Sequence, residues 1–222
     1  MIRVNVVVEG QTERSFVGDV LAPTLWAHDI YLFPILLGVP GHKGGRPNYA
    51  RVKKDILLNL KQDGNSYCST MLDFYGLGAG FPGAPRDANA TDAERAEQIE
   101  HAVKADICAT IPDCRPDVRL IPYLQLHEYE GLLFSDPQAF AAAINQASLG
   151  YEFQKIRDRF ATPEDINDNP NTAPSKRVEN LYPNYRKVLH GTDAARAVGI
   201  ETMRRECPHF GAWVEKLKSL RR

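Results

Sequence analysis

The sequence predicts an α/β protein with a mainly parallel sheet flanked by helices, followed by a helical C-terminal section. In the first part of the chain, short β-branched apolar runs alternate with segments of helical periodicity. This alternation is typical of a parallel sheet, because parallel strands need crossover connections that are usually helical. After Gly131 the alternation ends, and the remaining patterns are helical.

The first predicted strand covers residues 4–8, a run apolar enough to be covered on both faces. A helix follows, with apolar side chains at helical spacing from Phe16 to Leu25 and Thr12 as its candidate cap. Thr91 and Glu94 have the spacing of a capping box at the start of another helix. The further predicted strands are residues 31–37, 67–72 and 118–126, and the further helices are residues 49–60 and 91–108.

The C-terminal third contains five predicted helices, at residues 138–145, 153–160, 182–189, 194–203 and 210–217. A connector rich in Pro and Asn, residues 165–171, interrupts them. A chain of 222 residues is long enough to bury one sizeable core. We therefore expect an α/β core at residues 1–135 and a helical section at residues 136–222 packed on it.

Composition restricts the classes of function. The formal net charge of −1 argues against a protein that coats DNA over a wide surface, so any contact with nucleic acid should be local. The four cysteines have neither zinc-site spacing nor the density of a disulfide framework. Because the sequence shows no signal-peptide pattern and no long apolar span, we expect a cytoplasmic protein without a membrane partner.

Acidic residues follow three of the predicted strands. Glu9 follows the first, Asp73 the third, and Glu128 and Glu130 the last. Ligands of parallel α/β sheets collect at the carboxyl ends of strands, where these side chains could converge. Converging carboxylates repel one another and favour a hard divalent cation, for which Mg²⁺ or Mn²⁺ is the natural choice. Each acid taken alone could instead cap a helix or pair with Arg or Lys.

The sequence VEGQTE at residues 8–13 closely resembles the VEGxTE signature of Toprim-like proteins, including the nuclease domains of the overcoming-lysogenization-defect family. Further motifs resemble a bacterial Toprim-like family catalogued as domain of unknown function 4276. They are LDFYGL at residues 72–77, LHEYEGLLF at residues 126–134, PEDIN at residues 163–167 and PSKR at residues 174–177. The resemblance implies a Toprim-like, Rossmann-like fold.

The resemblance also implies a set of metal ligands. Glu9 and Asp73 take the positions of the first-strand glutamate and the first aspartate of the DxD pair. Tyr75 stands where the second aspartate is expected, so Glu128 or Glu130 would have to supply the missing carboxylate, and Glu128 is preferred. If the chain is still extended there, Glu128 and Glu130 share one face while His127 points away, so both acids could serve.

Further residues are candidates for catalysis and for binding nucleic acid. Glu13, one helical turn beyond Glu9, could bind a second metal or orient the attacking water. His127 could act as a general acid or hydrogen-bond a ligating carboxylate, and a purely structural role is the alternative. Lys176 and Arg177 suit phosphate contacts, with Lys176 also a candidate for a charge near the reacting phosphate.

A second basic cluster, HKGGR at residues 42–46, places Lys43 and Arg46 beside flexible glycines. Backbone amides and side chains there could approach a phosphate backbone, although a solvated surface loop is the equal alternative. The sequence GAGFPG at residues 78–83 matches GxGxxG, but Pro82 and Pro85 separate it from the next helix start. We therefore expect no dinucleotide cofactor.

The leading hypothesis is Mg²⁺-dependent hydrolysis of phosphodiester bonds in DNA, within a bacterial defence or mobile-element module. Metal held by Glu9, Asp73 and Glu128 would polarise the phosphate and lower the pKa of a bound water. An ATPase partner is implied by the resemblance. The alternative is a non-catalytic Toprim-like subunit that binds nucleic acid or such an ATPase.

Overall fold

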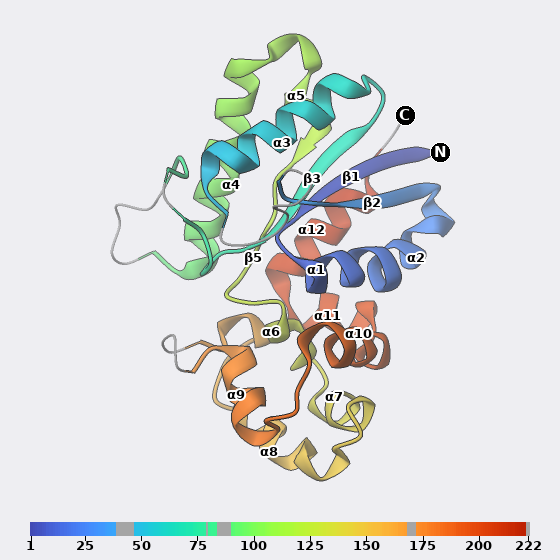
Figure 1. The fold of residues 1–222 in the computed structure, drawn as a ribbon, viewed down its shortest axis with the longest axis vertical. Helices are drawn as coiled ribbons and strands as arrows, with labels where there is room; N and C mark the ends of the chain where they lie inside the picture. Colours follow the sequence, from blue (N-terminus) through green and yellow to red (C-terminus); the bar gives the residue numbers. More distant parts are fainter. Residues whose placement is uncertain (39–46, 79, 84–89, 168–171, 221–222) are drawn as a thin grey trace.

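The computed structural model describes residues 1–38, 47–78, 80–83, 90–167 and 172–220. In this part of the chain, a five-stranded sheet has the order β2-β1-β3-β4, and β5 also pairs with β3. The strands are β1 (Ile2–Val8), β2 (Ile30–Leu36), β3 (Tyr67–Asp73), β4 (Leu120–Ile121) and β5 (Leu124–Gln125). All their pairings are parallel. The predicted α/β class with a helical C-terminal part is confirmed (Figure 1).

The helices begin with α1 (Gln11–Ser15), which continues through a π-helical segment, Phe16–Leu21, into α2 (Ala22–Leu25). The others are α3 (Tyr49–Gln62), α4 (Asp92–Thr110), α5 (Pro116–Arg119), α6 (Glu130–Leu133), α7 (Pro137–Ala143), α8 (Gly150–Arg157), α9 (Pro174–Leu181), α10 (Lys187–Val198), α11 (Ile200–Glu206) and α12 (Pro208–Lys218). The capping box at Thr91 is present. The hydroxyl of Thr91 accepts the Glu94 N–H at 3.2 Å, and the Thr91 N–H donates to the Glu94 carboxylate at 2.8 Å. None of the described helices combines the length and hydropathy that a membrane crossing requires.

The two faces of β1 belong to two different hydrophobic clusters. Val4, Val6 and Val8 pack with α12 and other parts of the C-terminal section, whereas Val7 packs with α3 and α4. Figure 1 shows α3 and α4 on one side of the sheet and α1, α2 and α12 on the other. This burial on both faces agrees with the near-continuous apolar sequence of the strand.

The last predicted strand begins later than expected and is broken. Residues 118 and 119 belong to α5, and the remainder is split into β4 and β5. Pro122 lies at the break, and it has no N–H to continue the ladder with β3. Thr70 of β3 bridges this gap, because its hydroxyl donates to the carbonyl of Tyr123 and accepts from the Tyr123 N–H, both at 2.8 Å.

Several predicted helices have different bounds. The first begins at Gln11 with Gly10 as its N-cap, in place of Thr12. The helix predicted at residues 182–189 is wrong, because α9 ends at Leu181 and α10 begins at Lys187. The helix predicted at residues 194–203 is divided at Gly199, whose φ of +80° is a conformation that favours glycine. The PSKR motif forms the first turn of α9.

Buried aromatic side chains join the C-terminal helices to the sheet. Trp213 of α12 stacks on Tyr123 with ring centroids 4.2 Å apart, and its Nε1 donates to Oγ of Ser69 on β3 at 2.9 Å. One hydrophobic cluster contains residues from both sides of position 135. The division into residues 1–135 and 136–222 stays a prediction.

Replacing Phe153 of α8 with Ala should destabilise the protein, because its ring is fully buried against Phe134 and Phe140. We expect the free energy of unfolding to fall by about 3–5 kcal/mol, measured by chemical denaturation. Tyr151→Ala on the same helix is the control, since Tyr151 is 67% exposed. Its effect should stay within about 0.5 kcal/mol. Equal losses in the two variants would contradict this packing of α8.

Candidate metal centre

Two acidic side chains come from neighbouring strands at the carboxyl end of the sheet. Glu9 directly follows β1, and Asp73 is the last residue of β3, which pairs with β1 so that Val8 lies opposite Met71. The turn after β3 brings Gly76 between them. A Cβ atom at Gly76 would lie 3.5 Å from Oε2 of Glu9 and 3.6 Å from Cβ of Asp73. The two acids therefore flank the same short piece of backbone.

Glu13 reaches this end of the sheet from the first turn of α1. Its carboxylate accepts the Gly10 N–H at 2.8 Å, and the residue is only 7% exposed. A Cβ atom at Gly10 would lie 3.0 Å from the same carboxylate oxygen, so glycine leaves room for this contact. Burial raises the pKa of Glu13, although the backbone N–H groups and the charge of Lys187 oppose the shift. The VEGQTE motif thus positions two acids.

The surroundings of Asp73 disfavour its charged form. Burial raises the pKa of Asp73 well above its usual value, and the charges of Glu13, Glu9, Glu130 and Glu128 raise it further. Its Oδ1 is buried and has no hydrogen-bond partner among the residues that the structure describes. A buried carboxylate oxygen without a donor is costly, and either a proton or a cation would relieve that cost.

The segment after β5 turns, so it is not extended as a shared face of Glu128 and Glu130 would require. His127 has a left-handed φ of +59°, and Glu130 is the first residue of α6. Oε2 of Glu128 accepts the N–H of Ser175 on α9 at 3.0 Å. Glu130 is 2% exposed, and its Oε1 lies 3.7 Å from Nζ of Lys187. Burial raises the pKa of Glu130 to about 7.

Lys187, the first residue of α10, faces these carboxylates and belongs to none of the sequence motifs. Burial lowers the pKa of Lys187, but the charges of Glu130, Glu128 and Asp73 outweigh this and raise it overall. The ammonium group therefore stays charged and partly neutralises the acids. Its contact with Glu130 joins two helices far apart in the sequence, so no local pattern could have revealed it.

Gly191, one turn after Lys187, allows α10 to approach α6 closely. A Cβ atom at Gly191 would lie 3.1 Å from the ring of Tyr129 and 3.2 Å from the hydroxyl of Tyr185. The Tyr129 hydroxyl also donates to the Gly191 carbonyl at 2.8 Å. This close packing holds the start of α10 against Glu130.

His127 contacts other loops. Its Nδ1 lies 3.0 Å from the side-chain amide of Asn167, and its Nε2 lies 3.6 Å from the carboxylate of Asp92. Burial lowers the pKa of His127, which favours the neutral imidazole. These contacts tie the turn that carries Glu128 to the start of α4. A role for His127 as a general acid stays a prediction.

The two basic residues predicted on the PSKR motif lie beside Ser175 on α9. Lys176 pairs with Glu179 at 2.6 Å, and 53% of its side chain is exposed. Nε of Arg177 donates to the Thr172 carbonyl at 2.6 Å, and the guanidinium lies over the ring of Phe160. Phosphate binding by Lys176 and Arg177 stays a prediction. The other two predicted nucleic-acid contacts, Lys43 and Arg46, lie outside the described residues.

In the described part of the chain, no three His, Cys, Asp or Glu side chains are already arranged to hold a metal ion. Glu13 and Glu128 each accept a backbone N–H instead. The set of donors nevertheless fits Mg²⁺ or Mn²⁺, because it consists of carboxylate oxygens and includes the buried Oδ1 of Asp73. In both Glu13 and Glu128 the N–H contact uses Oε2, so the other carboxylate oxygen is the one that could turn to a metal.

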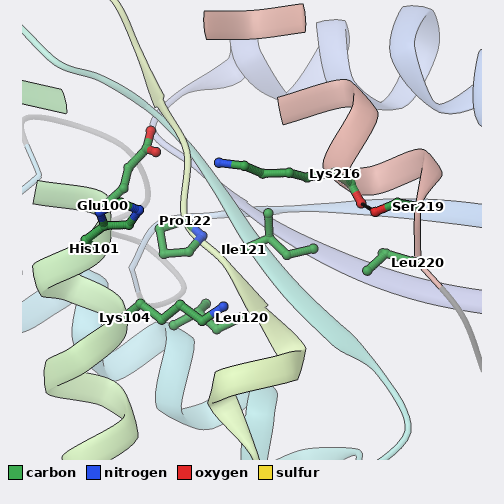
Figure 2. Close-up of a pocket in the computed structure, with 9 residues that line it drawn as sticks. All are labelled: Glu100, His101, Lys104, Leu120, Ile121, Pro122, Lys216, Ser219 and Leu220. Carbon is green, nitrogen blue, oxygen red and sulfur yellow. Dashed lines mark hydrogen bonds between the residues drawn. The ribbon is translucent and has the colours of Figure 1, made fainter. Parts of the chain in front are cut away.

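A hollow of about 300 Å³ at the β4 edge of the sheet is separate from these acids, none of which lines it. Figure 2 shows the lining side chains, which come from α4, from β4 and the residue after it, and from α12 and the residues after it: Glu100, His101, Lys104, Leu120, Ile121, Pro122, Lys216, Ser219 and Leu220. The carboxylate of Glu100 already accepts the Leu124 N–H at 2.8 Å and lies 2.9 Å from Nε2 of His209. This acid is engaged within the fold, unlike Oδ1 of Asp73.

The model of one protein family, a domain of unknown function called DUF4276, matches residues 8–218. The chain belongs to the DUF4276 family. No curated protein and no solved structure gives a significant match. The DUF4276 membership predicted from the sequence motifs is confirmed. The matched residues include the five carboxylates and Lys187, so the whole centre lies within the DUF4276 domain.

The metal-free DUF4276 protein should lose stability as the pH rises from about 4.5 to about 7. Between these values folded Glu130 keeps its proton, whereas the unfolded side chain has lost it. Since the folded state then binds more protons, its stability falls with rising pH. The slope from one such group approaches about 1.4 kcal/mol per pH unit. Chemical denaturation in EDTA at a series of pH values measures this slope.

Glu130→Gln removes the titrating group and should reduce the slope, leaving the parts that arise from Asp73 and Glu13. Lys187→Met removes the neighbouring cation, raises the pKa of Glu130 further and should extend the fall to higher pH. If the wild type and Glu130→Gln lose stability at the same rate, the carboxyl of Glu130 is not buried as described.

Proposed function

We propose that the protein is a Toprim-like, Mg²⁺-dependent nuclease that hydrolyses phosphodiester bonds in DNA. The observation that carries this proposal is the gathering of five carboxylates at the carboxyl ends of parallel strands, around a buried Asp73 oxygen with no hydrogen-bond donor among the described residues. Acids gathered in this way need protons or a cation to balance their charge. An all-oxygen set of ligands selects a hard divalent ion such as Mg²⁺ or Mn²⁺.

In this proposal Glu9 and Asp73 hold the cation from adjacent strand ends, with Glu128 or Glu130 as a further ligand. A bound Mg²⁺ supplies Lewis-acid activation of the phosphate and of a water molecule. Glu13 is buried and its raised pKa suits a group that orients the attacking water and accepts its proton. Lys187 presents its ammonium group to the negative charge of the phosphate.

Two further residues hold part of the site in place or contact the bound strand. His127 fixes the turn that carries Glu128 through its contacts with Asn167 and Asp92. Lys176, largely exposed on α9, can leave Glu179 and meet a phosphate of the bound strand. The positive charge of Lys176 supports that role, as does its position next to Ser175, whose backbone N–H donates to Glu128.

The Toprim relation rests on the VEGQTE motif, whose Gly10 and Glu13 form the contact described above. That relation would imply a bacterial defence or mobile-element setting and an ATPase partner, and a cytoplasmic location is part of the same proposal. The motif and the fold jointly support the Toprim relation, since the motif lies at the end of the first strand of a parallel sheet.

Glu9→Gln and Asp73→Asn should each reduce cleavage of DNA by at least about a hundredfold, because each removes a metal ligand. The measurement is Mg²⁺- and Mn²⁺-dependent cutting of supercoiled plasmid, linear duplex and single-stranded DNA. Asp117→Asn is a matched control, as Asp117 is an exposed acid in α5, directly before β4 at the opposite end of the sheet. Metal-dependent cutting that survives both site substitutions would rule out this centre.

A non-catalytic subunit that binds nucleic acid or an ATPase is the second candidate. Two observations favour it: Tyr75 replaces the second aspartate of the DxD pair, and no three acids of the described residues are pre-arranged for a metal. Calorimetry with Mn²⁺ separates the candidates. A protein that neither binds Mn²⁺ nor cuts DNA would support the subunit.

Lys187→Gln should bind Mn²⁺ several-fold more tightly than the wild type, because it removes a positive charge that lies 3.7 Å from Glu130 and repels the cation. Calorimetry is done at a pH well above 7, so that Glu130 is ionised in both proteins. Lys216→Gln is the control, because Lys216 lines the separate hollow at the β4 edge. Weaker Mn²⁺ binding in Lys187→Gln alone would contradict the position assigned to the ammonium group.

A further inference from the structure

The connector between α9 and α10 lies directly beside the candidate metal centre. It runs from Tyr182 to Arg186 and leads into Lys187, which faces Glu130. Tyr185 within it is buried, and its hydroxyl has no hydrogen-bond partner in the described part of the chain. α6 contacts both α9 and α10, the two helices that this connector joins (Figure 1).

The outer surface of the connector is hollowed. One hollow of about 540 Å³ is lined by Tyr182, Pro183, Asn184, Tyr185, Arg186 and His190. A second hollow, of about 470 Å³, is lined in part by Arg186, Lys187 and Arg196. Arg186 belongs to both hollows, and Lys187 belongs both to the second and to the carboxylate site. Arg186 and Lys187 therefore link the two hollows to the carboxylate site.

Aromatic rings and cations occur together on this surface. The rings of Tyr182 and His190 have centroids 5.6 Å apart, and those of Tyr185 and His190 are 5.7 Å apart. The N–H of Arg186 donates to Nδ1 of His190 at 2.9 Å, which fixes the orientation of the imidazole. Tyr182 and His190 remain partly exposed, and Arg186 is exposed.

This combination matches the chemistry of an unpaired strand of nucleic acid. Bases stack on aromatic rings whatever their sequence, and phosphates pair with nearby Lys and Arg. In a duplex the faces of the bases are already stacked on one another, so a ring outside the helix cannot reach them. Cations alone would bind both forms, whereas the rings give a preference for single strands.

We propose that the α9–α10 connector is a docking surface for single-stranded DNA, with unpaired bases on the Tyr182–His190 rings and phosphates at Arg186 and Lys187. This rests on the proposed function, and it names unpaired DNA as the class of substrate. A strand that leaves the carboxylate site past Lys187 meets Arg186 next and then the rings. The positive charges of Lys187 and Arg186 thus offset the repulsion between the acids and the phosphates of the strand.

The test measures binding without catalysis. Fluorescence anisotropy with labelled oligothymidylate, or with the same strand paired to oligodeoxyadenylate, is recorded in EDTA at low salt. The wild type should bind the single strand more tightly than the duplex. Tyr182→Ala should weaken single-strand binding by about tenfold. Tyr182→Phe should bind as tightly as the wild type because the ring is retained.

Two further variants keep the result interpretable. Trp26→Ala removes an aromatic side chain that is 54% exposed before β2, at the opposite end of the sheet, and should leave binding unchanged. Arg186→Gln, a surface substitution with little risk to folding, should weaken binding and reduce its dependence on salt. Preference for the duplex, no binding at all, or equal effects of Tyr182→Ala and Trp26→Ala would each overturn the proposal.

The outcome is separable from that of the proposed function. Asp73→Asn should abolish cleavage and yet bind oligothymidylate in EDTA as tightly as the wild type, because Asp73 lies at the end of β3 and outside the connector. A protein that binds through Tyr182 but never cuts DNA contradicts only the nuclease. One that cuts DNA with Tyr182 dispensable for binding contradicts only the docking surface.

Discussion

Repulsion among the acids at the carboxyl ends of β1, β3 and β5 is the constraint to which the surrounding elements conform. Neighbouring parallel strands end side by side, so Glu9 and Asp73 come close through topology alone. The C-terminal section then supplies groups that offset the charge of the other acids: the N–H of Ser175 for Glu128 and the ammonium of Lys187 for Glu130. Without these contacts the same sheet would have to keep its acids protonated. The helical section therefore completes the site as well as covering the sheet.

Much of the fold follows from local patterns in the sequence. The first strands are apolar runs of the length that parallel strands need, and Thr91 with Glu94 caps α4 as its spacing indicates. Where the prediction failed, local chain breakers and contacts between residues distant in sequence both decided the outcome. Pro122 breaks the last strand, and the Thr70 hydroxyl makes that break tolerable. The pattern at residues 182–189 is helical in period, yet its first half is a connector whose tyrosines contact α7 and α10.

Part of the site was also predictable from the sequence. Acids at strand ends follow from the sheet, and Gly10 explains why Glu13 joins them. The left-handed turn at His127 was not predictable, because histidine has no strong preference for that conformation, and it changes which way Glu128 and Glu130 point. Lys187 was missed because its contact with Glu130 is purely tertiary. Local sequence therefore identifies the acids, whereas their counter-ion depends on the packed fold.

The position of α12 at the end of the chain affects how the protein can be made. Trp213, Phe210 and Val214 cover the face of β1 that carries Val4, Val6 and Val8, and Trp213 also satisfies Ser69 on β3. During synthesis β1 is made long before α12, so the nascent chain exposes this apolar face until α12 has emerged. Such a surface attracts other chains and is the kind that chaperones protect. A chain cut short before α12 would keep all the strand-end acids but would leave this face of the sheet without Phe210, Trp213 and Val214.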